Sequence, residues 1–182
     1  MRIYTKTGDD GTTGLLYGGR ISKSDPAAEA YGSVDETVAA LGVVRAASHS
    51  PVLNRIVLRL QRELFVVGAD LATNPGERHK LKAGVSLVTE EMVTGLEELI
   101  DRNVEQHPLP QEFVVPGANP VSAALDVART QCRRAERRSV ELREAGRAVS
   151  GEAVRYLNRL SDLLFVLARW QAGGPEEPSR EP

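Results

Sequence analysis

Apolar residues recur at spacings of three and four along five stretches of the chain, which is the period of an amphipathic helix. The clearest stretch runs from Leu53 to Leu71, where the apolar positions form one continuous stripe. The pattern predicts helices over residues 24–48, 51–74, 89–107, 119–146 and 150–173. Because the connections look short enough to make neighbours antiparallel, we expect an all-α fold, a five-helix up-and-down bundle.

Start and stop signals agree with these limits. Ser24-Asp25-Pro26 and Asn119-Pro120 each combine a capping side chain with proline in the first turn. Asn74-Pro75-Gly76 ends the second predicted helix, and Gly173-Gly174 ends the fifth. The apolar face of the fourth helix comprises Val121, Ala124, Leu125, Ala128, Cys132, Ala135 and Leu142. That of the fifth comprises Leu157, Leu160, Leu164, Leu167 and Ala168.

Four other segments lack a helical period. Residues 1–23 are rich in Gly, Thr and Asp and predict an ordered loop or a flexible arm, whereas residues 73–88 are polar and basic and predict a mobile loop. Phe113-Val114-Val115 predicts a short extended segment, and the Pro- and Glu-rich residues 173–182 predict a disordered tail. We therefore expect one domain over residues 1–172, divided into an N-terminal segment (1–23) and a bundle (24–172).

Composition narrows the classes of function. The 182 residues contain 23 Lys and Arg and 25 Asp and Glu, a formal net charge of −2, so we expect neither a nucleic-acid partner nor a membrane-surface protein. The single cysteine, Cys132, excludes an internal disulfide and suits a small core residue. No stretch approaches the roughly 18 apolar residues of a membrane span, and the N-terminus lacks an apolar signal core. A cytoplasmic location is the expectation.

The polar positions of the fourth predicted helix are candidate chemistry. Arg129, Arg133 and Glu136 sit at i, i+4 and i+7 and form a stripe of their own, with Arg137 one turn beyond Arg133. Guanidinium groups present planar forks that suit phosphate oxygens. A solvated helix face with i,i+4 pairs accounts for the same charge run. Both interpretations are open at this stage.

Asn158 and Asp35 lie inside predicted helices, although Asn and Asp have poor helix propensity. Asn158 lies opposite the apolar face of the fifth helix, which favours a specific hydrogen-bonding role. Asp35 lies off the apolar stripe of the first helix, where it could pair with an arginine of the fourth helix or be an ordinary surface acid.

The N-terminal segment from Thr5 to Gly14 combines glycines, hydroxyls and Lys6. Glycines let backbone amides turn toward an anion, and hydroxyls donate hydrogen bonds, so this segment could cradle phosphates. It is not a Walker sequence, because no Gly-Lys-Ser/Thr follows a four-residue gap and no strand precedes it. A plain flexible arm fits the composition equally well.

Four segments taken together resemble one protein family. They are Tyr4-Thr5-Lys6-Thr7-Gly8-Asp9, Gly32-Ser33-Val34-Asp35-Glu36, Cys132-Arg133-Arg134-Ala135-Glu136-Arg137-Arg138 and Tyr156-Leu157-Asn158-Arg159-Leu160-Ser161-Asp162. In this order they resemble the PduO-type ATP:cob(I)alamin adenosyltransferases, over nearly the whole of residues 1–172. The resemblance implies a bundle that assembles as a homotrimer with active sites between subunits. It also implies a reaction in which Co(I) of cobalamin attacks the 5′ carbon of ATP and triphosphate leaves.

The implied reaction accounts for the lack of a visible nucleophile and base. Co(I) is itself a strong nucleophile, so the protein's tasks are to position the ribose carbon and to stabilise charge on the leaving triphosphate. Mg²⁺ would bridge phosphate oxygens with few protein ligands. By resemblance, the residues that wrap the triphosphate are Thr5, Lys6, Thr7, Gly8, Thr13, Gly14 and Lys23. Those that complete the nucleotide site are Arg133, Arg134, Glu136, Arg137 and Asn158.

The resemblance assigns further roles to single residues. Arg133 is the main charge stabiliser, Arg129 pairs with Asp35 across a subunit boundary, and Asp162 gives structural support. Phe113 matches a phenylalanine that packs under the corrin ring and excludes the lower axial ligand of Co(II)alamin, which eases reduction because axial ligation sets the redox potential. Plain core packing is the alternative for Phe113.

The sequence departs from the family after this phenylalanine. The family often has Pro-Gly-Gly, whereas this chain has Pro116-Gly117-Ala118, and alanine restricts the backbone where glycine would not. The implied partners are ATP, cobalamin, a reductase that supplies the electron and an adenosylcobalamin-dependent mutase that receives the product. Two other functions are open: a bundle that binds and delivers cobalamin or a nucleotide with little turnover, and a structural trimer whose arginines serve only subunit contacts.

Overall fold

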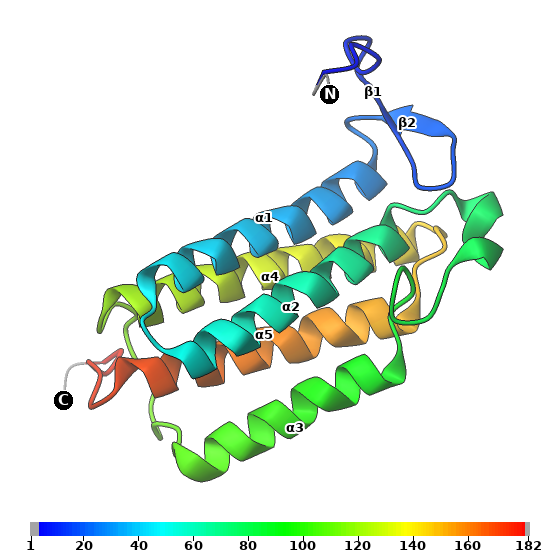
Figure 1. Ribbon diagram of the computed structural model, residues 1–182. Helices are drawn as coiled ribbons and strands as arrows, with labels where there is room; N and C mark the ends of the chain where they lie inside the picture. The colour runs from blue at the N-terminus through cyan, green and yellow to red at the C-terminus, as the bar shows by residue number, and fades with distance from the viewer. Residues whose placement is uncertain (1–3, 181–182) are drawn as a thin grey trace.

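Five α-helices form the body of the protein in the computed structural model, which describes residues 4–180 (Figure 1). They are α1 (Pro26–Ala47), α2 (Pro51–Leu71), α3 (Glu90–Gln106), α4 (Pro120–Glu144) and α5 (Gly151–Ala172). A 3-10 helix, η1 (Pro75–Lys80), lies between α2 and α3. Each α-helix lies within the limits that the sequence predicts. None of the helices in the described range is both long and apolar enough to cross a membrane.

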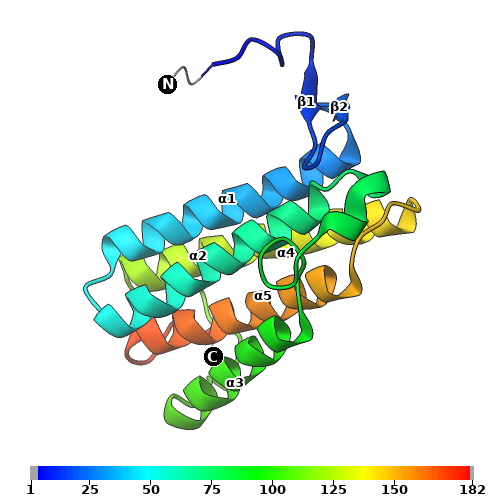
Figure 2. The same cartoon turned by 45° about the vertical axis from the view of Figure 1, so that its right-hand side comes forward.

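The N-terminal segment contains a small hairpin, where the sequence predicts an ordered loop or a flexible arm. Its two antiparallel strands are β1 (Thr12–Gly14) and β2 (Arg20–Ser22), with Thr13 opposite Ile21. Gly11, Gly18 and Gly19 have positive φ angles, which glycine adopts without strain. The hairpin stands at the end of the bundle where α1 begins (Figures 1 and 2).

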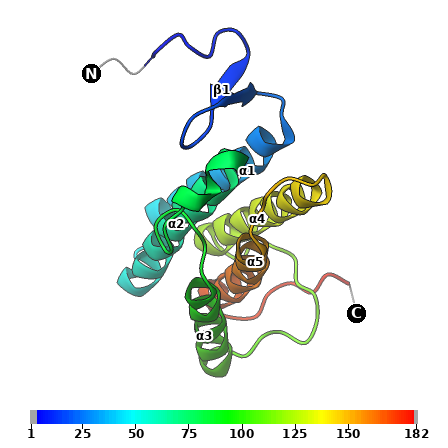
Figure 3. The ribbon, with the colours of Figure 1, turned by 90° about the vertical axis from the view of Figure 1, so that its right-hand side faces the viewer.

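Consecutive helices run in opposite directions, as an up-and-down bundle requires (Figure 1). Their order in space differs from their order in the chain: α1 packs on α2 and α4, while α5 packs on α4 and α3. Seen along the helix axes, α5 lies between α3 and the other helices (Figure 3). The predicted antiparallel order of consecutive helices holds (Figure 1), although residues 72–89 and 107–119 form longer connections that carry the chain to and from α3.

The core contains the predicted apolar faces. On α5, the five predicted residues from Leu157 to Ala168 are fully buried. On α4, Leu125, Ala128, Cys132, Ala135 and Leu142 are buried, and Val121 and Ala124 pack against them half-buried. Cys132 donates from Sγ to the Leu157 carbonyl at 3.3 Å, and burial raises the pKa of its thiol. The core role predicted for Cys132 is confirmed.

Asp70 is a fully buried carboxylate that joins three parts of the chain. It accepts hydrogen bonds from Arg78 Nη2 and Ser150 Oγ, both at 2.6 Å, and from the Val88 N–H at 3.3 Å. These bonds fasten η1 and the residues that follow it to the ends of α2 and α5. Residues 73–88 are thus an ordered connection, not the mobile loop that their polarity predicts, because Arg78 and the Val88 amide bond to a buried carboxylate.

Replacing Asp70 with asparagine should lower the free energy of unfolding by about 3 kcal/mol, the lower end of the cost of breaking a buried ion pair, because Arg78 is partly exposed. Urea denaturation measures the change. Glu141→Gln is the control, since the Arg138–Glu141 pair is exposed and should contribute less than about 1 kcal/mol. Equal effects of the two substitutions would mean that Asp70 does not hold the connection.

The C-terminal residues follow α5 with defined contacts. The Val115 N–H donates to the Glu177 carbonyl at 2.8 Å, and the Ser179 N–H donates to the Phe113 carbonyl at 2.7 Å. The segment lies beside the α3–α4 connection in Figure 3. Residues 173–180 thus have defined backbone contacts in the structure, where the sequence predicts a disordered tail. Residues 181–182 of that tail, and residues 1–3 of the N-terminal segment, lie outside the described residues.

Candidate functional site

Helices α4 and α5 gather four of the predicted nucleotide-site residues around one open cavity of about 350 Å³. The four are Arg133, Glu136, Arg137 and Asn158. Asn158 donates from Nδ2 to Glu136 Oε1 at 3.0 Å, and its Oδ1 accepts from Arg159 Nη1 at 2.8 Å. The amide is thus held from both sides, in agreement with the specific hydrogen-bonding role that its poor helix propensity suggests.

The two arginines of this cavity have no acidic partner. Arg133 and Arg137 are exposed, and neither forms an ion pair with any residue between 4 and 180. By contrast, two neighbouring arginines of α4 are paired: Arg138 with Glu141 at 2.9 Å, and Arg134 with Glu36 of α1. Unpaired guanidinium groups beside an open cavity offer planar forks to an anionic ligand.

A larger, mainly apolar cavity of about 650 Å³ also has Arg133 in its lining. Its apolar wall comprises Ile100, Val104, Leu109, Phe113, Val114, Pro116, Phe165 and Val166. Arg129, Arg133 and Asp162 are among its polar residues. Arg133 therefore belongs to both cavities, so a ligand in one would meet a ligand in the other at this side chain.

Phe113 is 85% exposed and stands at the mouth of the apolar cavity rather than in the core. Plain core packing is therefore excluded as its role. The turn behind it places Gly117 at φ +129, while Ala118 has no positive φ angle. The glycine that this backbone requires is present, and the alanine that departs from the family pattern occupies a position that tolerates a side chain.

Arg129 and Asp35 lie on different faces of the chain and do not meet. Arg129 lines the apolar cavity, with Nε 3.9 Å from Asp126 Oδ1 and its guanidinium 5.9 Å from the centre of the Phe165 ring. Asp35 lies over the groove between α1 and α2, a cavity of about 410 Å³ whose lining includes Phe65, 66% exposed. An ion pair between them requires a second copy of the chain.

Most of the predicted triphosphate-binding residues lie close together at the hairpin. Arg20 of β2 organises them: its Nε donates to Thr12 Oγ1 at 2.8 Å, and its Nη2 donates to the Thr7 carbonyl. Lys23 reaches back to Gly8, where a Cβ would lie 3.4 Å from Lys23 Nζ and 3.2 Å from the Thr12 carbonyl. Glycine at position 8 thus permits an approach that a larger residue would strain.

Among the other members of this group, Thr5, Lys6, Thr7 and Gly14 are exposed and Thr13 is half-buried. The hydroxyls of Thr5 and Thr7 lie 2.8 Å apart, Lys6 has a left-handed φ of 60°, and Thr13 and Gly14 belong to β1. No residue between 4 and 23 lines either cavity on α4 and α5. The structure therefore brings the predicted site together as two groups, one at the hairpin and one on α4 and α5, that are separate within one chain.

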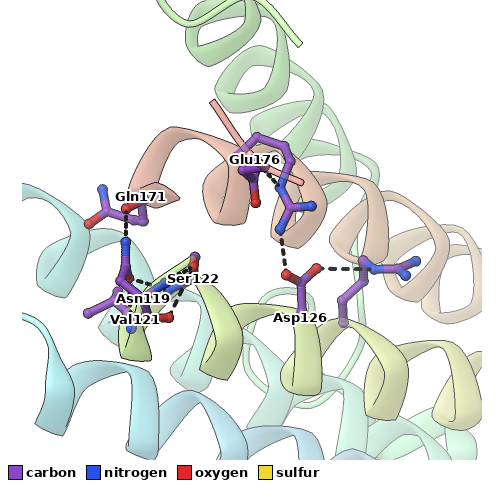
Figure 4. Close-up of polar contacts among 8 residues, drawn as sticks. Asn119, Val121, Ser122, Asp126, Gln171 and Glu176 are labelled. Carbon is purple, nitrogen blue, oxygen red and sulfur yellow. Dashed lines mark hydrogen bonds and ion pairs between the residues drawn. The ribbon is translucent and has the colours of Figure 1, made fainter. Parts of the chain in front are cut away.

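Sequence reasoning missed two features of the site. Arg20 organises the hairpin, but its role depends on the pairing of β1 with β2, and strands of three residues leave little periodic signal. A buried ionic chain runs from Arg129 through Asp126 and Arg169 to Glu176 (Figure 4). The i,i+3 spacing of Asp126 and Arg129 was visible in the sequence, but the partners on α5 and beyond it were not.

Metal ligands are not clustered. In the part of the chain that the structure describes, no group of three or more His, Cys, Asp or Glu side chains is placed to hold a metal ion. The two groups of predicted site residues instead provide unpaired arginines, hydroxyls and backbone amides, which are ligands for an anion.

The fold and this arrangement define a class: a helical bundle with an arginine-lined polar cavity, a larger apolar cavity and one arginine that lines both. The Cobalamin adenosyltransferase family matches residues 3–171, and the chain belongs to that family. Its relatives include a corrinoid adenosyltransferase of Citrobacter freundii, 46% identical over 96% of this chain and 97% of the relative. The corrinoid adenosyltransferase PduO of the same organism is 40% identical over 93% of this chain, which spans 49% of that relative.

Solved structures of the same family have the same fold. A variant of the PduO-type ATP:corrinoid adenosyltransferase from Lactobacillus reuteri, complexed with cobalamin and ATP, superposes with a TM-score of 0.89 at 34% identity. The superposition covers 99% of this chain and 100% of that one. A second variant of that protein, complexed with ATP, gives a TM-score of 0.86 at 35% identity, over 98% of this chain and 100% of that one.

Proposed function

We propose that this protein transfers the 5′-deoxyadenosyl group of ATP to cob(I)alamin and releases adenosylcobalamin and triphosphate. Relatives that cover more than nine-tenths of the chain at 40–46% identity are corrinoid adenosyltransferases, and a structure of similar fold holds both cobalamin and ATP. The observation of this structure that carries the proposal is the position of Arg133 on the wall between the polar and the apolar cavity. Adenosyl transfer requires a nucleotide and a corrinoid to meet at one point.

The reaction needs little covalent chemistry from the protein. The electron pair of Co(I) forms the cobalt–carbon bond at C5′ while the bond from C5′ to the phosphate oxygen breaks, and that pair leaves with triphosphate. Arg133 and Arg137 stabilise the charge that develops on the leaving group. Glu136 and Asn158 hydrogen-bond to each other and so fix the wall of the cavity beside these arginines. Mg²⁺ would arrive with ATP and take its ligands mainly from phosphate oxygens and water.

We place each active site between two subunits of a homotrimer. The hairpin group and the arginine cavity are separate within one chain, and Arg129 and Asp35 lie on different faces. A neighbouring chain would bring these separated groups together. Its hairpin residues Thr5, Lys6, Thr7 and Gly8 would close over the triphosphate, and its Asp35 would meet Arg129 of the first chain. The groove between α1 and α2 beside Asp35, with its exposed Phe65, is a suitable surface for that contact.

Replacing Asp35 with alanine should impair assembly and turnover together, with a loss of about tenfold in kcat/KM, because it removes one side of an intersubunit ion pair. Sedimentation velocity and a turnover assay follow the two properties. Glu36→Ala is the matched control, since Glu36 pairs with Arg134 inside the chain. A variant that exchanges the charges, Asp35→Arg with Arg129→Asp, should recover part of the loss. Normal assembly and turnover of Asp35→Ala would refute the bridge.

Phe113 would pack under the corrin ring from its exposed place at the mouth of the apolar cavity. There it would exclude the lower axial ligand of Co(II)alamin and ease the reduction to Co(I). Arg134 and Asp162 would support the site from its edges. A reductase that donates the electron and a mutase that accepts adenosylcobalamin are the proposed partners.

Turnover tests the function as a whole. The protein is mixed with MgATP and chemically reduced cobalamin, and the light-sensitive cobalt–carbon product is followed by its absorbance. Steady product formation is expected. Binding of ATP and cobalamin without product would instead indicate a delivery module, and binding of neither would leave only a structural role for the arginines.

A further inference from the structure

Glu176 is a buried acid that anchors the C-terminal segment, residues 173–180. Its carboxylate is 5% exposed and lies 3.1 Å from Arg169 Nε, which is equally buried (Figure 4). The same arginine donates from Nη2 to Asp126 Oδ2 at 2.5 Å, and Asp126 faces Arg129. Two acids and two arginines thus alternate along one line. Burial raises the pKa of the Glu176 carboxyl, and a buried carboxylate persists only with such partners.

The anchored segment is paired with the Phe113 loop. Glu177 accepts the Val115 N–H through its backbone carbonyl, and Ser179 donates its N–H to the Phe113 carbonyl. These two hydrogen bonds enclose a bridge between Val114 and Pro178. The loop has few other ties: Phe113 is 85% exposed, and Val115 is 51% exposed. Its conformation therefore depends on the C-terminal segment, which in turn depends on Glu176.

We propose that Glu176 is a positioning residue for the corrinoid: by docking on Arg169 it holds the C-terminal segment against the Phe113 loop and so sets the place of Phe113 at the apolar cavity. The inference rests on the proposed function, since the corrinoid is the ligand assigned to that cavity. It also links the loop to the interior of the site, because Asp126, Arg129 and Arg169 line the same cavity.

The neighbouring residue offers a matched control. Glu177 is exposed and contributes only its backbone carbonyl to the pairing, so Glu177→Gln removes the same charge without touching the anchor. Glu176→Ala removes the anchor entirely. Glu176→Gln keeps the shape and a hydrogen-bonding group but not the charge, and it should lie between the wild type and the alanine variant.

Hydrogen exchange of the full-length protein tests the contact without reference to activity. In Glu176→Ala, amide exchange in residues 109–117 should rise on the order of tenfold, because loss of the buried ion pair lets the C-terminal segment open locally, while exchange in the cores of α4 and α5 stays unchanged. Glu177→Gln should leave the loop at the wild-type rate. Unchanged exchange in the loop of both Glu176 variants would overturn the proposal.

Steady-state kinetics then test positioning. In Glu176→Ala, KM for reduced cobalamin should rise about threefold or more, because the loop must be ordered on binding, while KM for ATP stays constant. If Glu176 only stabilised the fold, its loss would reduce the fraction of active enzyme, so kcat would fall and both KM values would stay unchanged. That result would overturn the proposal. Wild-type kinetics in Glu176→Ala would overturn it too. Absence of turnover in the unsubstituted protein would refute the proposed function instead, and the exchange result would still decide whether Glu176 holds the loop.

Discussion

Replacing Arg133 with alanine should lower kcat for adenosyl transfer by about 10²–10³, the usual cost of removing a group that stabilises charge in the transition state. Arg133 is the one residue of α4 that lines both cavities, so under the proposed function it is the side chain of α4 that we expect to meet the nucleotide and the corrinoid together. It is exposed and forms no ion pair within residues 4–180, so its removal leaves no buried partner stranded. The fold should therefore remain intact.

Single-turnover kinetics with MgATP and cob(I)alamin measure the chemical step directly, and thermal unfolding checks the fold. Arg143→Ala is the matched control: Arg143 is an exposed arginine in the last turn of α4 and lines neither cavity. The control should behave as the wild type does. Turnover of Arg133→Ala within about twofold of wild type, against the hundredfold or larger loss expected of a charge stabiliser, would remove Arg133 from the site.

Phe113→Ala should separate the two forms of the corrinoid substrate. The reaction that starts from Co(II)alamin and a reductant should fall by tenfold to a hundredfold, in the range typical of changes around a metal centre. The reaction that starts from chemically prepared Co(I)alamin should fall by less than about threefold, because Co(I) has no lower axial ligand to displace. The exposed position of Phe113 makes a general loss of stability from this substitution small.

Parallel assays on one preparation distinguish this role from simple binding. Phe113→Leu is the graded variant, since it keeps an apolar side chain but shortens its reach, and it should fall between alanine and the wild type in the Co(II) assay. Equal losses from Co(II) and Co(I) would assign Phe113 to corrinoid binding alone.

The helices and their core faces could be predicted because both depend on local pattern. The stripe from Leu53 to Leu71 has the helical period, and Asp25 and Asn119 cap α1 and α4 as their positions before proline suggest. Asn119 accepts from the Val121 and Ser122 amides and also donates to the Gln171 carbonyl at 2.7 Å (Figure 4). The first contacts are local and were foreseeable. The last joins residues 52 positions apart and was not.

The order of two loops could not be predicted either, because it depends on contacts between residues that are distant in sequence. Residues 73–88 and 173–180 are polar enough to suggest mobility, but each contains or meets a charged group whose partner is distant in sequence: Arg78 on Asp70, and Glu176 on Arg169. Composition records the polarity of a segment and says nothing of a buried partner. Buried ion pairs are therefore the features most easily lost when a sequence is interpreted by composition.

The sequence could indicate candidate residues for the site but not their geometry. Spacing on α4 made Arg133 and Arg137 candidates, and the poor helix propensity of Asn158 suggested a hydrogen-bonding role. Its partners, Glu136 and Arg159, are known only from the structure. The spacing could not show that Arg133 separates two cavities or that the hairpin group lies apart from both. Those facts depend on how the helices pack.

A crystal structure of the protein with MgATP and cobalamin most directly tests whether two chains share one active site. We expect triphosphate between the Arg133 cavity of one subunit and the Thr5–Gly8 segment of its neighbour, with the corrin ring over Phe113 in the apolar cavity. Nucleotide bound away from both the arginine cavity and the hairpin, or bound wholly within one chain, would contradict it.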